Sequence, residues 1–248
     1  MQEEATPQVS KGKKASVERL DSNIDPVEYC HQRGWTDGLP VVPPMPDLVQ
    51  AMLEAAGRDP SEVLAVFPPL QGEVTVEKVA INAVMAGCLP KYFPVILAAA
   101  EGLARRERSL GGLFTTIHGD SPLIIVNGPM RAQQGFNSGA NLFGPGWRPN
   151  ATVGRAISLL VRNLGTGPPG DFDEVTLAHP GKYTYCIAEY EEVSPWSPLH
   201  VERGYQIEES TVTVLGAQAP LSVTDTVSIT ARGILDSVAD AMSIRGTY

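Results

Sequence analysis

The chain has 248 residues, of which 43% are hydrophobic, and its mean hydropathy of −0.05 is close to zero. This length and composition predict a globular chain with one sizeable apolar core. The formal net charge is −9 and the sequence has no basic face, which excludes nucleic acid as an expected partner.

No segment predicts a membrane span, a signal peptide or a disulfide framework. The longest apolar run, 92–100, is too short for a bilayer and contains Pro94, and the N-terminus has no apolar core. The three cysteines have unpaired spacings. We therefore expect a cytoplasmic protein with no membrane contact.

The N-terminal segment 1–22 is polar and predicts a flexible tail, followed by a single domain over 23–248. Four prolines between residues 40 and 46 exclude a central strand or helix there, so this run is expected over the surface or in a groove. A first helix is expected over 47–56, because Gly57 is a natural C-terminal cap.

Two further helices are predicted before the middle of the chain. Residues 76–87 are apolar on nearly every side, which predicts a buried helix, and Thr75 can cap its first turn. A helix over 91–106 follows Pro90.

The second half of the chain mixes strands and helices. Strands are expected over 113–117, 123–126, 183–188 and 211–215, and helices over 151–163 and 229–242. A regular strand–helix–strand rhythm is missing. The predicted fold is therefore α/β or α+β, a single compact domain with a mixed sheet and several packed helices.

A glycine-rich segment, residues 135–155, is the strongest functional signal. It contains five glycines, two prolines, three asparagines and two arginines. Ordering so many glycines is costly, and long loops within a compact domain are commonly functional. We interpret it as a substrate-facing loop in which Ser138 and Asn141 donate hydrogen bonds to a ligand.

The end of this segment predicts an anion-binding corner. Asn150 is a good N-cap for the following helix, and free amides at a helix start bind carboxylate or phosphate groups together with cations such as Arg148 and Arg155. Neither a dinucleotide fingerprint nor a P-loop is present. The alternative is a structural segment that wraps a neighbouring subunit.

Cys88, His118 and His200 are the candidate catalytic residues. Cys88 lies between two predicted helices, where it is either a stabilised thiolate or a small core residue. His118 follows a predicted strand and His200 follows three glutamates, so either is a candidate general acid or base. No metal site is predicted, because no paired His or Cys spacing occurs.

Three residues outside the glycine-rich segment are candidate binding residues. Trp35 and the proline run would form an aromatic, rigid wall of a groove. Asp37 either faces the ligand or caps its own turn. Asn82, on the apolar helix, either faces a ligand or fixes a neighbouring segment.

Three motifs together resemble a known bacterial family. They are Gly34-Trp35-Thr36-Asp37-Gly38-Leu39-Pro40-Val41-Val42-Pro43-Pro44, the segment from Val76 to Cys88, and the glycine-rich segment. The resemblance covers about residues 26–240, and members of this family accompany, or are fused to, UGSC-type (seleno)proteins. UGSC proteins resemble the thiol- or selenol-bearing component of glycine reductase systems. This implies thiol or selenol chemistry in a composite active site, although the chain has no Cys-Gly-Ser-Cys motif.

The sequence thus predicts an enzyme, or the non-redox subunit of one, that acts on a small polar and anionic metabolite. His118 or His200 would move protons, and Cys88 or a partner's thiol would attack. One alternative is a non-catalytic assembly partner of a (seleno)protein-type enzyme. Another is a stand-alone hydrolase or lyase that uses a histidine–carboxylate pair. We expect a homo- or hetero-oligomer, and the sequence identifies no cofactor.

Overall fold

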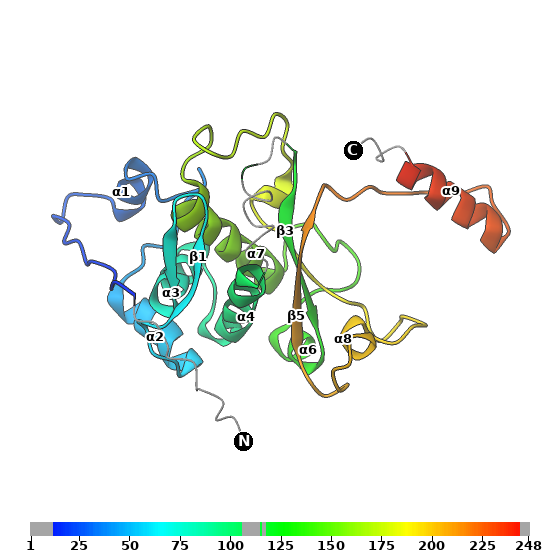
Figure 1. Cartoon of the computed structure of the whole chain (residues 1–248), viewed down its shortest axis with the longest axis horizontal. Helices are drawn as coiled ribbons and strands as arrows, with labels where there is room; N and C mark the ends of the chain where they lie inside the picture. Colours follow the sequence, from blue (N-terminus) through cyan, green and yellow to red (C-terminus); the bar gives the residue numbers. More distant parts are fainter. Residues whose placement is uncertain (1–11, 106–114, 116–117, 244–248) are drawn as a thin grey trace, which may run out of the picture.

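The computed structural model describes residues 12–105, 115 and 118–243, which form helices around a three-stranded sheet and a separate hairpin (Figure 1). This compact α+β arrangement confirms the predicted fold class with a mixed sheet. The boundary between an N-terminal tail and a single domain at residue 22 stays a prediction. Within the expected tail, however, the Gly12 amide donates to the Ser61 carbonyl (2.8 Å) and the Ala15 amide to the Glu77 carboxylate (2.8 Å).

The hairpin was not predicted from the sequence. Strand β1 (Val63–Phe67) pairs antiparallel with β2 (Gly72–Thr75), and the side chains of Phe67 and Val74 are fully buried. Each strand is too short to give a periodic signal, and two prolines follow the first. The hairpin is therefore stabilised by burial against the helices, and the local sequence pattern does not predict it.

The three-stranded sheet has the order β4-β3-β5. Strand β3 (Ser121–Asn127) runs parallel to β4 (Cys186–Ala188) and antiparallel to β5 (Thr211–Ala217). The predicted strands 123–126 and 211–215 are confirmed within β3 and β5. The strand predicted over 183–188 is shorter: residues 183–185 connect a 3₁₀ turn at Pro180–Lys182 to β4, which begins at Cys186. The strand predicted over 113–117 lies largely outside the described residues.

Each of the predicted helices is confirmed, with boundaries shifted by up to three residues. They are α2 (Pro46–Ala56), α3 (Val76–Ala86), α4 (Phe93–Ala104), α7 (Arg148–Val161) and α9 (Ala231–Ser243). Thr75 caps α3 as expected, by accepting a hydrogen bond from the Lys78 amide. The structure adds short helices that the sequence did not predict: α1 (Pro26–Gln32), α6 (Pro129–Gln134) and α8 (Leu199–Glu202).

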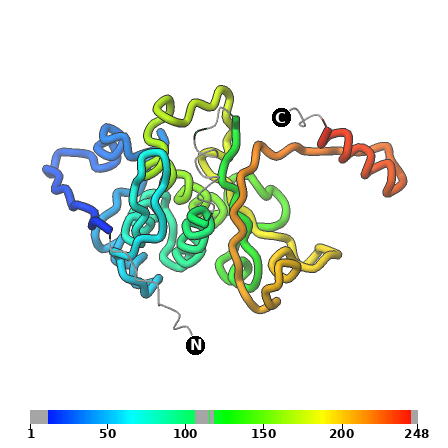
Figure 2. The backbone as a smooth tube through the Cα atoms, in the orientation of Figure 1, coloured from blue at the N-terminus to red at the C-terminus, as the bar shows by residue number. Residues whose placement is uncertain are grey.

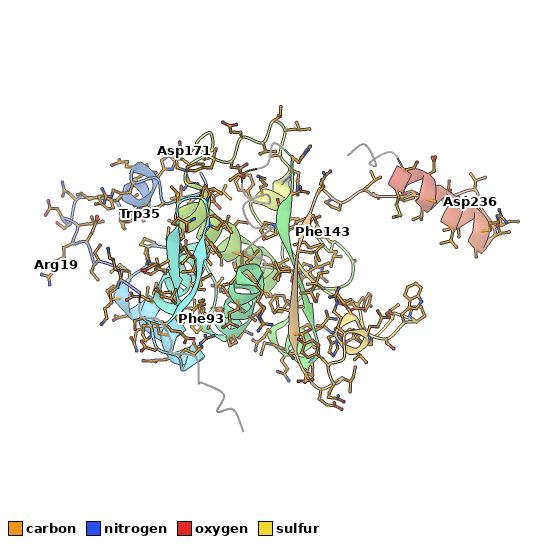
Figure 3. The ribbon with its side chains drawn as sticks, in the orientation of Figure 1. Arg19, Trp35, Phe93, Phe143, Asp171 and Asp236 are labelled. Atoms are coloured by element: carbon orange, nitrogen blue, oxygen red, sulfur yellow. The ribbon has the colours of Figure 1, made fainter. Side chains whose placement is uncertain are left out.

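The core lies between the hairpin and the sheet. Helix α4 packs against α3, α7, β1 and β5, so it joins the two sheets into one apolar interior. Its Phe93 is fully buried there (Figure 3). The fully buried side chains of α7 are apolar as well: Ile157, Leu159 and Leu160. From β5 the chain leads away from this interior to α9 (Figure 2).

Candidate functional site

A bidentate ion pair holds the proline-rich segment against α7. The Arg155 guanidinium donates two hydrogen bonds of 2.8 Å to the carboxylate oxygens of Asp37. It also donates to the carbonyl oxygens of Leu39 (3.3 Å) and Pro40 (2.9 Å). The side chain of Asp37 is only 9% exposed and that of Arg155 is 16% exposed. Each of these charges is therefore neutralised by the other within the fold.

The side-chain amide of Asn163, eight residues after Arg155, fixes the same segment at Trp35. The Asn163 side chain donates to the Trp35 carbonyl (3.1 Å) and to Asn82 Oδ1 (2.9 Å). Asn82 in turn donates to the Lys78 carbonyl (2.9 Å), so both ends of this buried amide are satisfied. Of the two readings of Asn82, the structure favours the one in which it fixes a neighbouring segment. Trp35 itself is half-buried and packs edge-to-face on Tyr29, with ring centroids 6.1 Å apart.

Asn150 is not the N-cap of the helix after the glycine-rich segment, which corrects our prediction. Helix α7 begins at Arg148 with Trp147 as its cap, so Asn150 lies inside the first turn. Its buried amide bridges the backbone of Asn137, accepting from its N–H (2.8 Å) and donating to its carbonyl (3.0 Å). Asn150 therefore fastens the glycine-rich segment to α7.

The remaining candidates of this segment lie apart from one another. The exposed Asn141 donates to the Pro145 carbonyl (3.0 Å), and Ser138 is half-buried. Arg148 donates to the Gly87 carbonyl (2.9 and 3.2 Å), which follows the last turn of α3. Because Arg155 is paired with Asp37, the expected anion-binding corner is occupied by contacts of the fold itself.

Cys88 is buried where α7 passes the end of α3. Its thiol donates to the Thr152 carbonyl (3.2 Å), and burial raises its pKa to about 12. A thiol with this pKa is protonated at neutral pH, whereas the nucleophile in thiol chemistry is the thiolate. The structure thus gives Cys88 the environment of a core cysteine, and its catalytic role stays a prediction.

Iodoacetamide should leave Cys88 unmodified in the native protein from pH 6 to 9. The expected labelling appears only when the protein is unfolded in denaturant, because folding both buries the sulfur and keeps it protonated. Mass spectrometry of the Cys88 peptide measures this, with the unfolded protein as the control. Rapid labelling of native Cys88 below pH 8 would contradict the core assignment.

His200 lies in a polar cluster beyond the carboxyl ends of β3 and β4. Its ring is fully buried, and Nδ1 is 4.0 Å from Glu191 Oε1. The same carboxylate accepts from Asn127 (3.0 Å) and the Gly128 amide (2.8 Å), and lies 3.1 Å from Arg131 Nε. The structure therefore brings His200 to a carboxylate, but neither described pocket reaches this pair.

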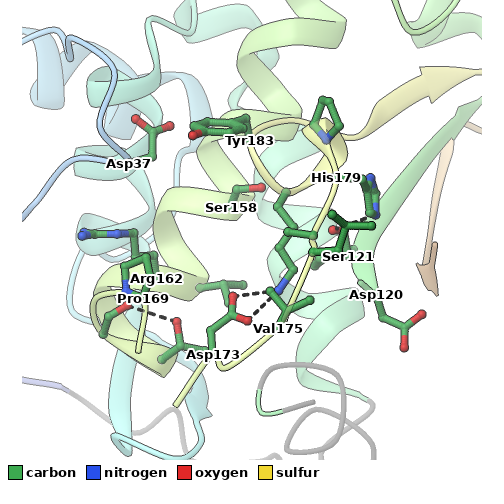
Figure 4. Close-up of a pocket in the computed structure, with 18 residues that line it drawn as sticks. Asp37, Asp120, Ser121, Ser158, Arg162, Pro169, Asp173, Val175, His179 and Tyr183 are labelled. Carbon is green, nitrogen blue, oxygen red and sulfur yellow. Dashed lines mark hydrogen bonds and ion pairs between the residues drawn. The ribbon is translucent and has the colours of Figure 1, made fainter. Parts of the chain in front are cut away.

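The larger described pocket lies at the opposite end of the sheet, at the amino end of β3. We call it the α7 pocket; its volume is about 630 Å³, and it is bounded by α7, the start of β3 and the loop 166–183 (Figure 4). Its polar wall residues include Ser121, Ser158, Arg162, His179, Lys182 and Tyr183. Of the binding residues predicted from the sequence, only Asp37 borders it.

Arg162 is the cation of this pocket that lacks a carboxylate partner among the described residues. Its guanidinium donates to the Gly34 carbonyl (2.5 Å) and, more weakly, to Asn163 Oδ1 (3.4 Å). Burial lowers the pKa of Arg162, and the nearby Asp37 only partly offsets this. Lys182, by contrast, pairs with both carboxylate oxygens of Asp173 (2.7 and 2.8 Å).

His179 places a defined ring nitrogen in the pocket. Its Nδ1 accepts the Gly181 amide hydrogen (3.1 Å), so the proton of the neutral ring resides on Nε2, 3.5 Å from the Ser121 hydroxyl. Burial lowers the pKa of His179, which favours this neutral form. Hydrogen bonds to the backbone of Gly119 and Ala217 oppose this shift, so the ring of His179 is fixed to the fold at the pocket wall.

His118 borders a second, smaller pocket of about 270 Å³. The two pockets share the wall formed by Val175, Leu177, Ala178 and His179, so they are neighbours. Among the predicted catalytic residues, His118 is thus the one beside a described pocket, and its ring is exposed.

Comparison with family models, with curated proteins and with solved structures finds no match for this chain. The resemblance to the UGSC-associated family therefore stays a prediction. Among the described residues, no helix is long and apolar enough to span a bilayer, and no group of His, Cys, Asp and Glu is arranged to hold a metal ion.

Sequence reasoning missed most of the α7 pocket. Arg162 lies at the end of a predicted helix, where a cation is ordinary, and His179 lies in an irregular loop without a motif. Ser121 begins a strand from which only the apolar part was predicted. The one usable signal was a histidine shortly before each of the two parallel strands, His118 before β3 and His179 before β4.

Proposed function

We propose that this chain is an enzyme, or a subunit of a composite enzyme, that binds a small anionic metabolite in the α7 pocket. The observation that carries this proposal is Arg162, a partly desolvated cation on the pocket wall with no carboxylate partner in the part of the chain described. A bound carboxylate or phosphate would supply the missing charge and form charge-assisted hydrogen bonds.

The other residues of the pocket wall support binding of a polar ligand, and the adjoining pocket supplies a group for proton transfer. The hydroxyls of Ser121 and Ser158 offer hydrogen bonds to ligand oxygens. His118, on the adjoining pocket, is the group we assign to proton transfer, because its imidazole is exposed beside the wall that the two pockets share.

A thiol, if the reaction uses one, would come from a partner protein rather than from Cys88. The buried, protonated Cys88 favours the subunit form of the proposal, in which a UGSC-type partner completes the active site. The open pocket favours ligand binding by this chain over a purely structural role in that assembly.

Arg162→Gln should weaken anion binding by at least about tenfold, because the glutamine can keep a hydrogen bond but not the charge. Isothermal titration with inorganic phosphate and with a series of small mono- and dicarboxylates measures the Kd. Circular dichroism checks that the variant is folded.

Arg203→Gln is the matched control, since Arg203 is an exposed arginine in the short turn after α8. Its affinity for the same anions should equal that of the unmodified protein. The proposal fails if none of these anions binds, or if Arg162→Gln and Arg203→Gln have the same effect.

A further inference from the structure

The charges on the wall of the α7 pocket can accommodate one negative charge of a ligand. Arg162 has no carboxylate partner among the described residues, whereas Lys182 donates to both oxygens of Asp173 (2.7 and 2.8 Å). This ion pair is mostly buried, with side chains 20% and 25% exposed. A carboxylate bound at Arg162 would complete the charge pairing, and a second negative charge on the ligand would meet no available cation.

The remaining carboxylates of the wall oppose a second negative charge. Asp37 is neutralised by Arg155, and Asp120 has no lysine or arginine partner in the described part of the chain. Figure 4 shows Asp120 on the side of the pocket opposite Arg162. A dianion that extended from Arg162 across the pocket would therefore approach carboxylates, and like charges brought together in a partly buried site repel each other.

Much of the uncharged wall is apolar. Its apolar residues with branched or ring side chains are Pro122, Val161, Pro169, Val175, Leu177 and Pro180. Leu177 is 92% exposed and the Tyr183 ring is 48% exposed, so apolar surface gathers at the opening of the pocket. Such surface around a hollow is typical of ligand-binding grooves, and a volume of about 630 Å³ is typical of sites that enclose more than a bare anion. A ligand with an apolar body would cover these side chains.

We propose that the α7 pocket binds a monocarboxylate with an apolar body, and that Asp173 sets this selectivity by holding Lys182. Selectivity of this kind rests on the anion binding proposed above and specifies the class of anion. The carboxylate would contact Arg162 and the hydroxyl of Ser158, which lies four residues earlier on the same face of the helix. The apolar body would lie along the valine and proline side chains of the wall. Dicarboxylates are disfavoured because Lys182 is already paired.

Isothermal titration with three matched ligands tests the two parts of this selectivity. 3-Phenylpropionate should bind at least about tenfold more tightly than propionate, because its ring buries apolar surface in the pocket. It should also bind at least about tenfold more tightly than phenylsuccinate, which has the same ring and a second carboxylate that is ionised at neutral pH.

Asp173→Asn tests the role assigned to Asp173. The asparagine leaves Lys182 charged but without a counter-charge, so the preference for 3-phenylpropionate over phenylsuccinate should fall at least about tenfold. Adding Lys182→Gln to this variant should restore most of the preference, because it removes the cation that was freed. Circular dichroism checks that each variant is folded.

Asp171→Asn is the matched control, because it removes an exposed carboxylate from the same loop. The preference should stay within about twofold of the unmodified protein, since exposed charges are screened by salt.

The proposal is overturned if anions bind through Arg162 but propionate or phenylsuccinate binds as tightly as 3-phenylpropionate. Equal effects of Asp173→Asn and Asp171→Asn on the preference would overturn it as well. Failure of the proposed function gives a different result: none of the anions binds, or Arg162→Gln binds them no more weakly than Arg203→Gln. The selectivity proposed here would then fail with it.

Discussion

Replacing Asp37 by alanine should lower the free energy of unfolding by about 3 kcal/mol, because it leaves the Arg155 guanidinium poorly solvated and without its counter-charge. The expected loss is large for a loop residue, since the pair is bidentate and mostly buried. Urea denaturation followed by circular dichroism measures it.

Glu18→Ala is the control for this prediction. Glu18 pairs with Arg33 at 2.8 Å, but the two side chains are 35% and 49% exposed. Such a surface pair contributes about 0–1 kcal/mol, so the midpoint should barely move. Equal effects of Asp37→Ala and Glu18→Ala would show that the clamp between the proline-rich segment and α7 does not stabilise the fold.

Asn150→Ala should cost about 2–3 kcal/mol of unfolding free energy. The substitution leaves the buried amide hydrogen of Asn137 without a partner and removes one hydrogen bond from its carbonyl. Thermal and urea unfolding measure the loss, and the same variant can be titrated with the anions used for Arg162.

Gln50→Ala provides the comparison, because it removes a side-chain amide from an exposed position of helix α2. Its effect should stay within about 0.5 kcal/mol. If Asn150→Ala is as stable as Gln50→Ala but binds anions more weakly, Asn150 is a ligand residue and its assignment as a fastening residue is wrong.

The local pattern of the sequence was sufficient for the longer helices. The apolar stretch after Thr75 and the glycine after α2 define their helices through capping and left-handed termination, which depend on neighbouring residues alone. The hairpin β1–β2 and the short helices α1, α6 and α8 were missed. Each has only four to seven residues, and burial by distant segments stabilises it.

The candidate site was harder to predict, and for a different reason. The sequence indicated the motif around Trp35 and the glycine-rich segment as candidate binding regions. The sequence does not show which polar groups hydrogen-bond to each other in the fold. Asp37 pairs with Arg155, 118 positions away, and Asn82 pairs with Asn163, 81 positions away. Once these groups pair within the fold, they are no longer available to a ligand, and Arg162 is left on the pocket wall without a carboxylate partner among the described residues.

The sequence by itself predicted an α/β or α+β chain with a mixed sheet, one apolar core and a C-terminal helix. Those properties follow from composition, periodicity and capping, which act over a few residues. Only the tertiary structure decided that Cys88 is buried, that Arg162 and His179 share a pocket, and that α9 lies away from the apolar interior. Burial and charge pairing join residues far apart in the chain, and so they are fixed only when the whole chain has folded.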